Sequence, residues 1–207
     1  MLTLNNAQGM ITLTQHTDDM KVLKEYGSYA QIKEGKDLTA NELALINSWR
    51  QREFHSQPIV LSPDDENWGK KFFLVKDHQD ITAFGRLHET ELEFRTIVYP
   101  ILGIATIVAT EKGKGYGSRL LKSMHAFIEA DGRTAIGFCD PRLDTFYSKC
   151  GFDIITGTDR FLYMDSNGQL HKTDKPGDVL CLEGKDKVIT DIMNNPYDDI
   201  YLFRPFW

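Results

Sequence analysis

The sequence lacks the features that mark several large classes of protein. No apolar run approaches the roughly 20 residues that a membrane-spanning helix needs. The first residues contain neither a basic segment nor a cleavable apolar core, so we expect a cytoplasmic location. Lys and Arg number 24 against 30 Asp and Glu, and the net charge of −6 argues against non-specific nucleic-acid binding. The chain also lacks internal repeats and low-complexity linkers.

Cysteine is scarce as well. The three cysteines, Cys139, Cys150 and Cys181, are odd in number and do not have the paired spacing of a metal site. We therefore predict no metal. We interpret Cys150 as a small buried apolar residue rather than a reactive thiol.

What the chain does contain is enough apolar material for a core. It has 207 residues, of which 41% are hydrophobic and 11% aromatic, so one domain with an appendage is expected. Thr39 and Glu42 have the spacing of a capping box and predict a helix that runs to about Phe54. Residues 72–76 and 81–87 predict two strands joined by a polar turn.

The most informative stretch lies in the middle of the chain. The apolar, β-branched run from Ile101 to Val108 predicts a buried strand. Glycines then alternate at positions 113, 115 and 117, and apolar residues recur at helical spacing from Ser118 onward. The predicted order is strand, glycine-rich turn and helix.

This order suits the binding of a phosphate group. Free N–H groups and the helix dipole meet at the start of a helix, glycines let the backbone approach an anion closely, and Lys112 and Lys114 add positive charge. A simple turn remains the alternative. A P-loop does not fit, because Gly117 is followed by Ser118 and Arg119 instead of Lys and Ser or Thr. A dinucleotide-binding fingerprint does not fit either, because the turn lies mid-chain with the wrong glycine spacing.

Two segments together resemble the GNAT superfamily of acetyltransferases. The segment from Lys112 to Gly117 resembles the family's Arg/Gln-x-x-Gly-x-Gly/Ala loop, with Lys112 in place of Arg or Gln. The segment from Asp140 to Phe152 resembles the family's Asn-x-x-Ala-x-x-x-Tyr-x-x-x-Gly-Phe segment, with Asp140 in place of Asn and Leu143 in place of the small residue. The resemblance covers about residues 30–165.

The resemblance implies an acetyl-CoA co-substrate and the residues that bind it. The loop would hold the pyrophosphate, and backbone groups of the preceding strand would hold the pantetheine and the thioester oxygen. The implied cofactor-binding residues are Ala105, Ile107, Lys112, Gly113, Lys114, Gly115, Tyr116, Gly117 and Ser118. By the same resemblance Tyr147 is the general acid that protonates the CoA thiolate; packing of its ring in the core is the alternative.

The general base is not identified by the sequence. Many members of the family carry Glu on the central strand, but residues 101–105 contain no carboxylate. The amine proton would then leave through water or through a group outside the two motifs. The candidates are Glu91, Glu93, Asp140, the C-terminal carboxylate of Trp207, and His88. We interpret Glu91 and Glu93 as one face of a solvated edge strand.

The two ends of the chain lie outside the resemblance. Residues 1–29 are expected to form an irregular arm, 30–165 the acetyltransferase core, and 166–207 an extension. The extension ends in an aromatic and acidic tail that we expect to dock. Extra strands and a docked tail ending in Trp give a weaker architectural likeness to aminoglycoside 2′-N-acetyltransferases. That likeness implies a polycationic amine acceptor, with Asp140 and Trp207 as candidate substrate-binding residues.

The sequence therefore predicts an α/β protein with a mixed, twisted sheet of about six or seven strands flanked by helices. The resemblance predicts acetyl-CoA-dependent N-acetylation of a small-molecule amine by direct transfer. A non-catalytic acyl-CoA-binding or sensor module is the alternative, favoured by the missing strand carboxylate. Homodimer formation is left open.

Overall fold

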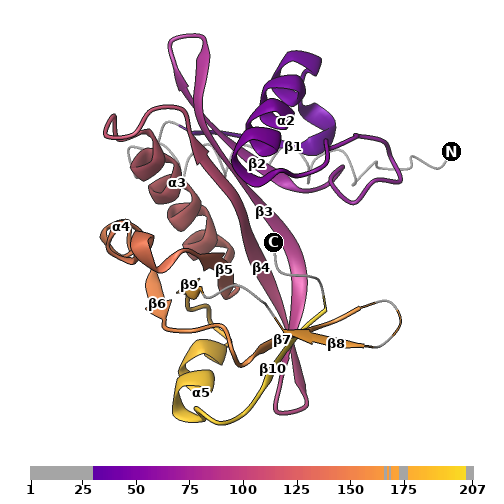
Figure 1. Ribbon diagram of the computed structural model, residues 1–207, viewed down its shortest axis with the longest axis vertical. Coiled ribbons are helices and arrows are strands. Elements are labelled where there is room, and N and C mark those ends of the chain that lie inside the picture. The colour runs from indigo at the N-terminus through magenta and orange to yellow at the C-terminus, as the bar shows by residue number, and fades with distance from the viewer. Residues whose placement is uncertain (1–29, 166, 168, 173–176, 204–207) are drawn as a thin grey trace, which may run out of the picture.

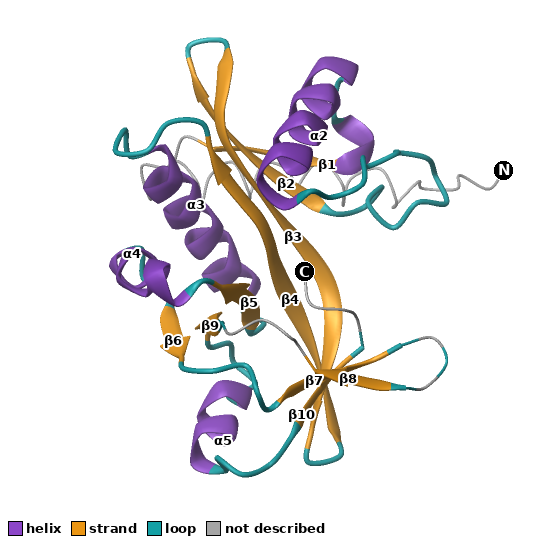
Figure 2. Ribbon diagram, in the orientation of Figure 1, coloured by secondary structure: helices purple, strands orange, loops and turns teal. Residues whose placement is uncertain are grey.

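The computed structural model describes residues 30–165, 167, 169–172 and 177–203. The predicted arm, residues 1–29, and the candidate substrate residue Trp207 lie outside these ranges. Figure 2 shows that the described residues form one twisted sheet with helices packed against it. The prediction of a mixed α/β fold is confirmed.

The sheet of the described residues has ten strands, more than the six or seven predicted. The additional strands are short, three or four residues each, which is too few for an alternating pattern to show in the sequence. In chain order the strands are β1 (Ala30–Glu34), β2 (Lys71–Asp77), β3 (Asp80–Phe94), β4 (Ile97–Ala109), β5 (Ala135–Cys139), β6 (Asp153–Ile155), β7 (Phe161–Met164), β8 (Leu170–Lys172), β9 (Asp178–Leu182) and β10 (Ile200–Leu202).

Four α-helices lie among the described residues. They are α2 (Ala40–Phe54), α3 (Tyr116–Asp131), α4 (Asp144–Lys149) and α5 (Val188–Asn194), with short 3-10 turns η1 (Gly35–Asp37) and η2 (Pro141–Leu143) before α2 and α4. The helices that the sequence predicted after Thr39 and from Ser118 onward are therefore present.

The long antiparallel pair β3–β4 is the axis of the sheet (Figure 1). β2 pairs with the first half of β3, and β10 pairs with its last residues. Glu91 and Glu93 are thus not on an edge strand as expected, because β3 has β4 on one side and β10 on the other at this level. Glu91 is nevertheless exposed and Glu93 half-buried, so their face is solvated.

The C-terminal residues contribute to the sheet at two places. β9 lies between β5 and β6, and β10 lies between β3 and β7. The sheet therefore runs through the predicted boundary at residue 165. In the described part of the tail, Ile200 and Leu202 are buried against Leu92 and Phe94 of β3.

The two large helices cover opposite faces of β3. Ala83 and Leu87 pack in one cluster with Leu120 and Met124 of α3. Phe84, which points the other way, packs instead with α2 through Trp49, whose ring centroid is 5.7 Å away. This follows from the alternation of side chains along a strand. Figure 1 shows α2 and α3 on either side of the β3–β4 pair.

The start of α2 is fixed by a buried carboxylate. The Glu42 side chain accepts a hydrogen bond from the Thr39 N–H at 2.9 Å, and the Thr39 hydroxyl accepts one from the Glu42 N–H at 3.2 Å, which completes the predicted capping box. Glu42 also pairs with Lys33 of β1 at 2.7 Å and with Lys76 of β2 at 3.3 Å. Burial acts to raise the pKa of Glu42, but these partners outweigh it and hold the pKa at about 2.

We predict that Glu42→Gln lowers the free energy of unfolding at pH 7 by about 1–3 kcal/mol, because two half-buried lysines, Lys33 and Lys76, lose their buried carboxylate partner. The folded pKa lies below the ordinary value, so this stabilisation is complete above about pH 4.5 and is lost as the pH falls towards 2. Urea unfolding of both proteins at pH 7 and at pH 3 measures the difference, which should shrink at pH 3.

Glu53→Gln is the control, because Glu53 lies on the same helix but pairs with Arg52 at an exposed position. Its effect should stay within about 0.5 kcal/mol. Equal losses for the two variants at pH 7 would contradict the assignment.

Candidate active site

A β-bulge interrupts β4 at Thr106. Phe84 is opposite Val108 and Arg86 is opposite Ala105, so Thr106 and Ile107 together face only Gly85. Thr106 has a φ of 57°, which a β-branched residue rarely adopts. A Cβ on Gly85 would lie 2.8 Å from Ile107 Cδ1 and 2.8 Å from Met124 Sδ, so a larger residue here would displace the ends of both side chains.

β4 also separates from its neighbour β5 at this level. The two strands pair in parallel only over Leu102–Ile104 and Ala135–Gly137. A Cβ on Gly137 would lie 2.9 Å from the Ile104 carbonyl oxygen, so glycine permits the close contact where the pairing ends. Beyond it, no described strand pairs with residues 105–109 on the β5 side. Backbone groups at Ala105 and Ile107 are thus available to a ligand between the strands.

The loop that follows β4 leads into the start of α3. Gly113 and Gly115 have φ values of 80° and 77°, a conformation that favours glycine, and both are exposed. Gly115 is the N-cap of α3, and no side chain caps the first N–H groups of this 16-residue helix. Uncapped N–H groups and the helix dipole together form a site for an anion.

Charged and polar residues of the loop agree with that chemistry. Lys112 and Lys114 are exposed, and neither forms an ion pair with any residue in the described ranges. Tyr116 is engaged elsewhere: its hydroxyl donates to Asp77 Oδ2 at 2.8 Å, and Arg119 lies 5.4 Å from its ring centroid. Tyr116 therefore ties the loop to the end of β2 through its side chain.

Gly117 and Ser118 face the neighbouring helix. A Cβ on Gly117 would lie 3.2 Å from Phe146 Cζ and 3.8 Å from Ala109 Cβ, so glycine lets the first turn of α3 pack against α4 and β4. Ser118 lies beside the Cys150 thiol. The close packing that Gly117 allows and the contact of Ser118 with Cys150 fix the position of the first turn of α3.

Tyr147, the predicted general acid, lies in the cluster that contains Ile107 and Ala109 of the unpaired part of β4. The residue is 6% exposed. Its hydroxyl has no hydrogen-bond partner among the described residues, yet it is not among the fully buried unpartnered polar atoms, so the oxygen still contacts accessible space. Burial, then the nearby Cys139 and Cys150, raises the pKa of the phenol above its usual range. The phenol is therefore protonated at neutral pH.

The cysteines are not placed as nucleophiles. Burial raises the pKa of Cys150, and it raises the pKa of Cys139 and of Cys181 to about 12. A thiol that stays protonated at neutral pH is a poor nucleophile.

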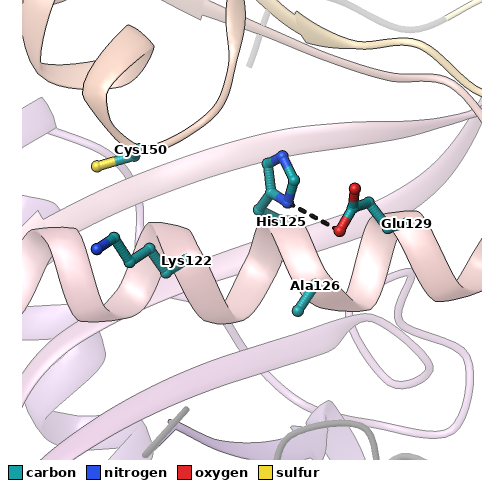
Figure 3. Close-up of a pocket in the computed structure, with 5 residues that line it drawn as sticks. All are labelled: Lys122, His125, Ala126, Glu129 and Cys150. Atoms are coloured by element: carbon teal, nitrogen blue, oxygen red, sulfur yellow. Dashed lines mark ion pairs between the residues drawn. The ribbon is translucent and has the colours of Figure 1, made fainter. Parts of the chain in front are cut away.

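Cys150 lines a hollow between α3 and the end of α4, of about 240 Å³, together with Lys122, His125, Ala126 and Glu129 (Figure 3). His125 pairs with Glu129 at 3.3 Å across one turn of α3. The sequence did not indicate this hollow, since these positions look like an ordinary solvated helix face.

The candidate bases are distributed over both faces of the sheet. Glu91 and Glu93 lie five and seven residues beyond Arg86 along β3, on the face of Leu87, opposite Pro100 and Val98. At about 3.3 Å per residue they are roughly 16 Å or more from the bulge. Their placement does not support a role as base.

Asp140 caps the turn η2 and pairs with Arg142. Hydrogen bonds from Arg142 lower its pKa to about 2, so it is a weak proton acceptor.

His88 lies on the other face of β3, opposite Gly103 and two residues from Arg86. It is 4% exposed. Because side chains alternate, His88 shares its face with Arg86 and Ala105, on the side of the sheet away from α3. The sequence signal was a polar run, Arg86, His88 and Thr90, at positions where the strand pattern calls for apolar residues.

The described residues contain neither a cluster of metal ligands nor a membrane-spanning helix. No three His, Cys, Asp or Glu side chains in the described part of the chain gather as metal ligands would. None of the helices there is both long enough and apolar enough to cross a membrane.

The fold of the chain is similar to that of solved structures. No protein-family model and no curated protein matches the sequence. Escherichia coli ElaA shares 15% identity over 74% of this chain and 98% of its own, with a TM-score of 0.51. An N-acetyltransferase from Staphylococcus aureus Mu50 shares 15% identity over 74% of this chain and 97% of its own, with a TM-score of 0.49. An acyl-CoA N-acyltransferase from Pseudomonas aeruginosa shares 17% identity over 72% of this chain and 97% of its own, with a TM-score of 0.47. The chain has the fold of the GNAT acyltransferases.

We predict that CoA binds at the Gly115 loop and that Gly115→Asp weakens binding about 10- to 100-fold, the loss expected when charge-assisted hydrogen bonds to an anion are opposed by a carboxylate. Isothermal titration with CoA measures the affinity. Gly115→Asn is the matched control, because Asn and Asp tolerate positive φ similarly and only Asp is charged. Equal affinities for the two variants would contradict a pyrophosphate site at this loop.

Proposed function

We propose that this protein is an acetyl-CoA-dependent N-acetyltransferase that acts on a small-molecule amine. The observation that carries the proposal is the bulge at Thr106 in a strand that has lost its partner on one side, immediately before a glycine loop and an uncapped helix start. Each part supplies one need of acyl transfer from a CoA thioester: free backbone groups for the carbonyl and pantetheine, and an anion site for the pyrophosphate.

The residues of the chain fit a direct transfer. Backbone groups near Ala105 and Ile107 would hold the thioester carbonyl and stabilise the oxyanion that forms when the amine nitrogen attacks. The carbon–sulfur bond then breaks, and the Tyr147 phenol gives its proton to the departing sulfur. The raised pKa of Tyr147 keeps this proton in place until that step. A covalent route through cysteine is not supported, because burial keeps the three thiols protonated.

The attacking amine must also lose a proton. We assign this proton to His88, directly or through water, because His88 is the candidate base that shares a face with Arg86 and Ala105, next to the bulge. Glu91 and Glu93 lie on the other face and too far along β3, and the pKa of Asp140 is too low. Trp207 lies outside the described residues, so its role as a substrate contact stays a prediction. The cytoplasmic location also stays a prediction, and homodimer formation stays open.

A non-catalytic acyl-CoA-binding module is the second candidate. The observation that favours it is the absence of a carboxylate from residues 101–105 of β4. Release of CoA thiol from acetyl-CoA in the presence of a panel of amines distinguishes the two. A protein that binds CoA but releases no thiol with any amine would be the binding module.

We predict that Tyr147→Phe lowers kcat about 10²- to 10⁴-fold, the range for loss of a general acid, while CoA affinity changes little. The substitution removes only the hydroxyl, which has no described hydrogen-bond partner, so packing and stability are retained. Steady-state kinetics with a thiol reagent measure kcat, and calorimetry measures CoA binding. If the variant has the wild-type kcat, and the chemical step is shown to limit the rate, Tyr147 has a purely structural role.

We predict that His88→Gln removes the acidic limb of the pH profile of kcat/KM. A histidine base is active when neutral, so the wild-type rate should fall in acid as the imidazole becomes protonated. Rates between pH 5 and 9 measure the profile. The same acidic limb in the variant would show that another group, or the amine itself, sets it.

A further inference from the structure

The face of β3 that points away from α3 carries a buried guanidinium. Arg86 is 9% exposed and lies between Phe84, which packs against α2, and His88. Arginine is rarely so buried unless it is paired with a carboxylate or another anion. Neither packing in the hydrophobic core nor the proposed acetyl transfer explains why the charged side chain of Arg86 is buried here.

Arg86 is next to the bulge. It is opposite Ala105, and the next residue of β4 is Thr106, which bulges. Cross-strand neighbours have Cα atoms about 5 Å apart, so the Arg86 side chain starts directly beside the strand segment where the thioester carbonyl would be held. It lies on the face opposite α3, where an amine would approach the carbonyl from the side away from the helix.

Few of the five N–H donors of the Arg86 guanidinium have a hydrogen-bond acceptor among the described residues. Nη1 donates to Asn67 Oδ1 at 2.6 Å. Nε is buried and has no hydrogen-bond partner among the described residues. Within the same residues no carboxylate lies within ion-pair distance of the guanidinium. One neutral amide is thus the only described partner of a buried positive charge.

The two nearby acidic side chains are engaged with other groups. Glu66 pairs with Lys70 at 2.9 Å. Asp65 accepts a hydrogen bond from the Asn67 N–H at 2.6 Å. Burial and the charge of Arg50 accordingly lower the pKa of Arg86 to about 10, against the weaker opposite effect of Glu66 and Asp65. The guanidinium stays charged at neutral pH, and its charge is not neutralised.

A second arginine adds to the positive charge. Arg50, in the last turn of α2, is half-buried, and burial lowers its pKa. Its Nη1 donates to the Gln57 carbonyl oxygen at 2.8 Å, while its Nε is buried and has no described partner. Two arginines with unused donors, partly withdrawn from water and close enough to affect each other, favour the binding of an anion between them.

The loop that carries Asn67 is held firmly. Gly35 N–H donates to the Lys70 carbonyl, and Lys36 N–H donates to the Trp68 carbonyl, both at 3.0 Å. A Cβ on Gly35 would lie 2.0 Å from the Asn67 carbonyl oxygen, so only glycine permits this packing. Asn67 is 8% exposed. The partner of Arg86 therefore belongs to a built site and is not a mobile surface residue.

We propose that the acceptor is an amino acid or a related small compound that carries both an amine and a carboxylate, and that Arg86, supported by Arg50 and Asn67, binds the carboxylate. This inference rests on the proposed N-acetyltransferase activity. A guanidinium matches a carboxylate in charge and in its planar, two-pronged geometry. With the carboxylate held at Arg86, an amine a few carbons away reaches the carbonyl at the bulge.

The test compares matched acceptors. Each amino acid in a panel is assayed beside its own carboxamide by release of CoA thiol from acetyl-CoA, with rates corrected for the fraction of neutral amine. Wild type should prefer at least one amino acid over its carboxamide by about 10-fold or more in kcat/KM, because a buried charged site left without its partner discriminates strongly. Arg86→Gln, which keeps an amide donor for Asn67, should bring this ratio close to one and leave the acetyl-CoA KM unchanged.

Controls separate a binding role from a structural one. Arg52→Gln changes an exposed arginine of the same helix as Arg50 and should keep the wild-type preference. Thermal unfolding checks that Arg86→Gln is folded; should it not be, Arg50→Gln supplies the test and should reduce the preference. A wild-type enzyme that prefers carboxamides or diamines, or an Arg86→Gln enzyme that keeps the wild-type ratio, would overturn the inference while the acetyltransferase activity stands.

A second measurement does not depend on turnover. Calorimetry with the amino-acid panel and CoA-saturated protein detects carboxylate binding directly. Binding that Arg86→Gln abolishes, without thiol release for any amine, would support the carboxylate site and reject the acetyltransferase proposal. The absence of binding to wild type would overturn the carboxylate site.

Discussion

The separation of β4 from β5 after Ile104 is the constraint on which the rest of the site depends. Backbone N–H and C=O groups inside a sheet are normally paired, and leaving them unpaired in a buried place is costly. Here the pairing stops after three residue pairs while both strands continue. The bulge at Thr106 turns the freed segment at the same level, and Gly85 and Gly137 provide the space on either side. The backbone groups without a strand partner are therefore a built-in feature of the sheet. They suit a ligand that would supply the missing hydrogen bonds.

The surrounding packing holds this arrangement rigid. Gly117 lets α3 contact Phe146, Tyr116 is bonded to Asp77, and the first turns of α3 pack on Ala83 and Leu87 of β3. The loop between β4 and α3 is thus held at its α3 end by side-chain contacts, although Gly113 and Gly115 are exposed. Sites that must place an anion and a carbonyl at a set distance benefit from such preorganisation, because little ordering remains to be done when the ligand binds.

The local elements could be predicted from the sequence, but the site only in part. The central strand, the glycine loop, α3 and the capping box of α2 each have a short-range pattern, and all are present. The bulge has no such pattern: Thr106 adopts a positive φ because Gly85, 21 residues earlier, lies across from it. The pairings of β9 and β10 depend equally on distant residues. Arg86, His88 and Thr90 are visible in the sequence as alternating polar residues, but the sequence alone does not show that their face borders the bulge.

The charge of the whole chain and the charge of the site point to different acceptors. A net charge of −6 agrees with the cationic acceptor that the sequence suggested. At about 0.15 M salt, however, charges on the surface are screened beyond about 8 Å, whereas buried charges are screened much less. The acidic groups nearest to Arg86 are already paired with Lys70 or bonded to the backbone of Asn67. The charged and polar groups beside the bulge are therefore two arginines and an amide, and under the proposed activity this local field, more than the net charge, would determine which amine binds there.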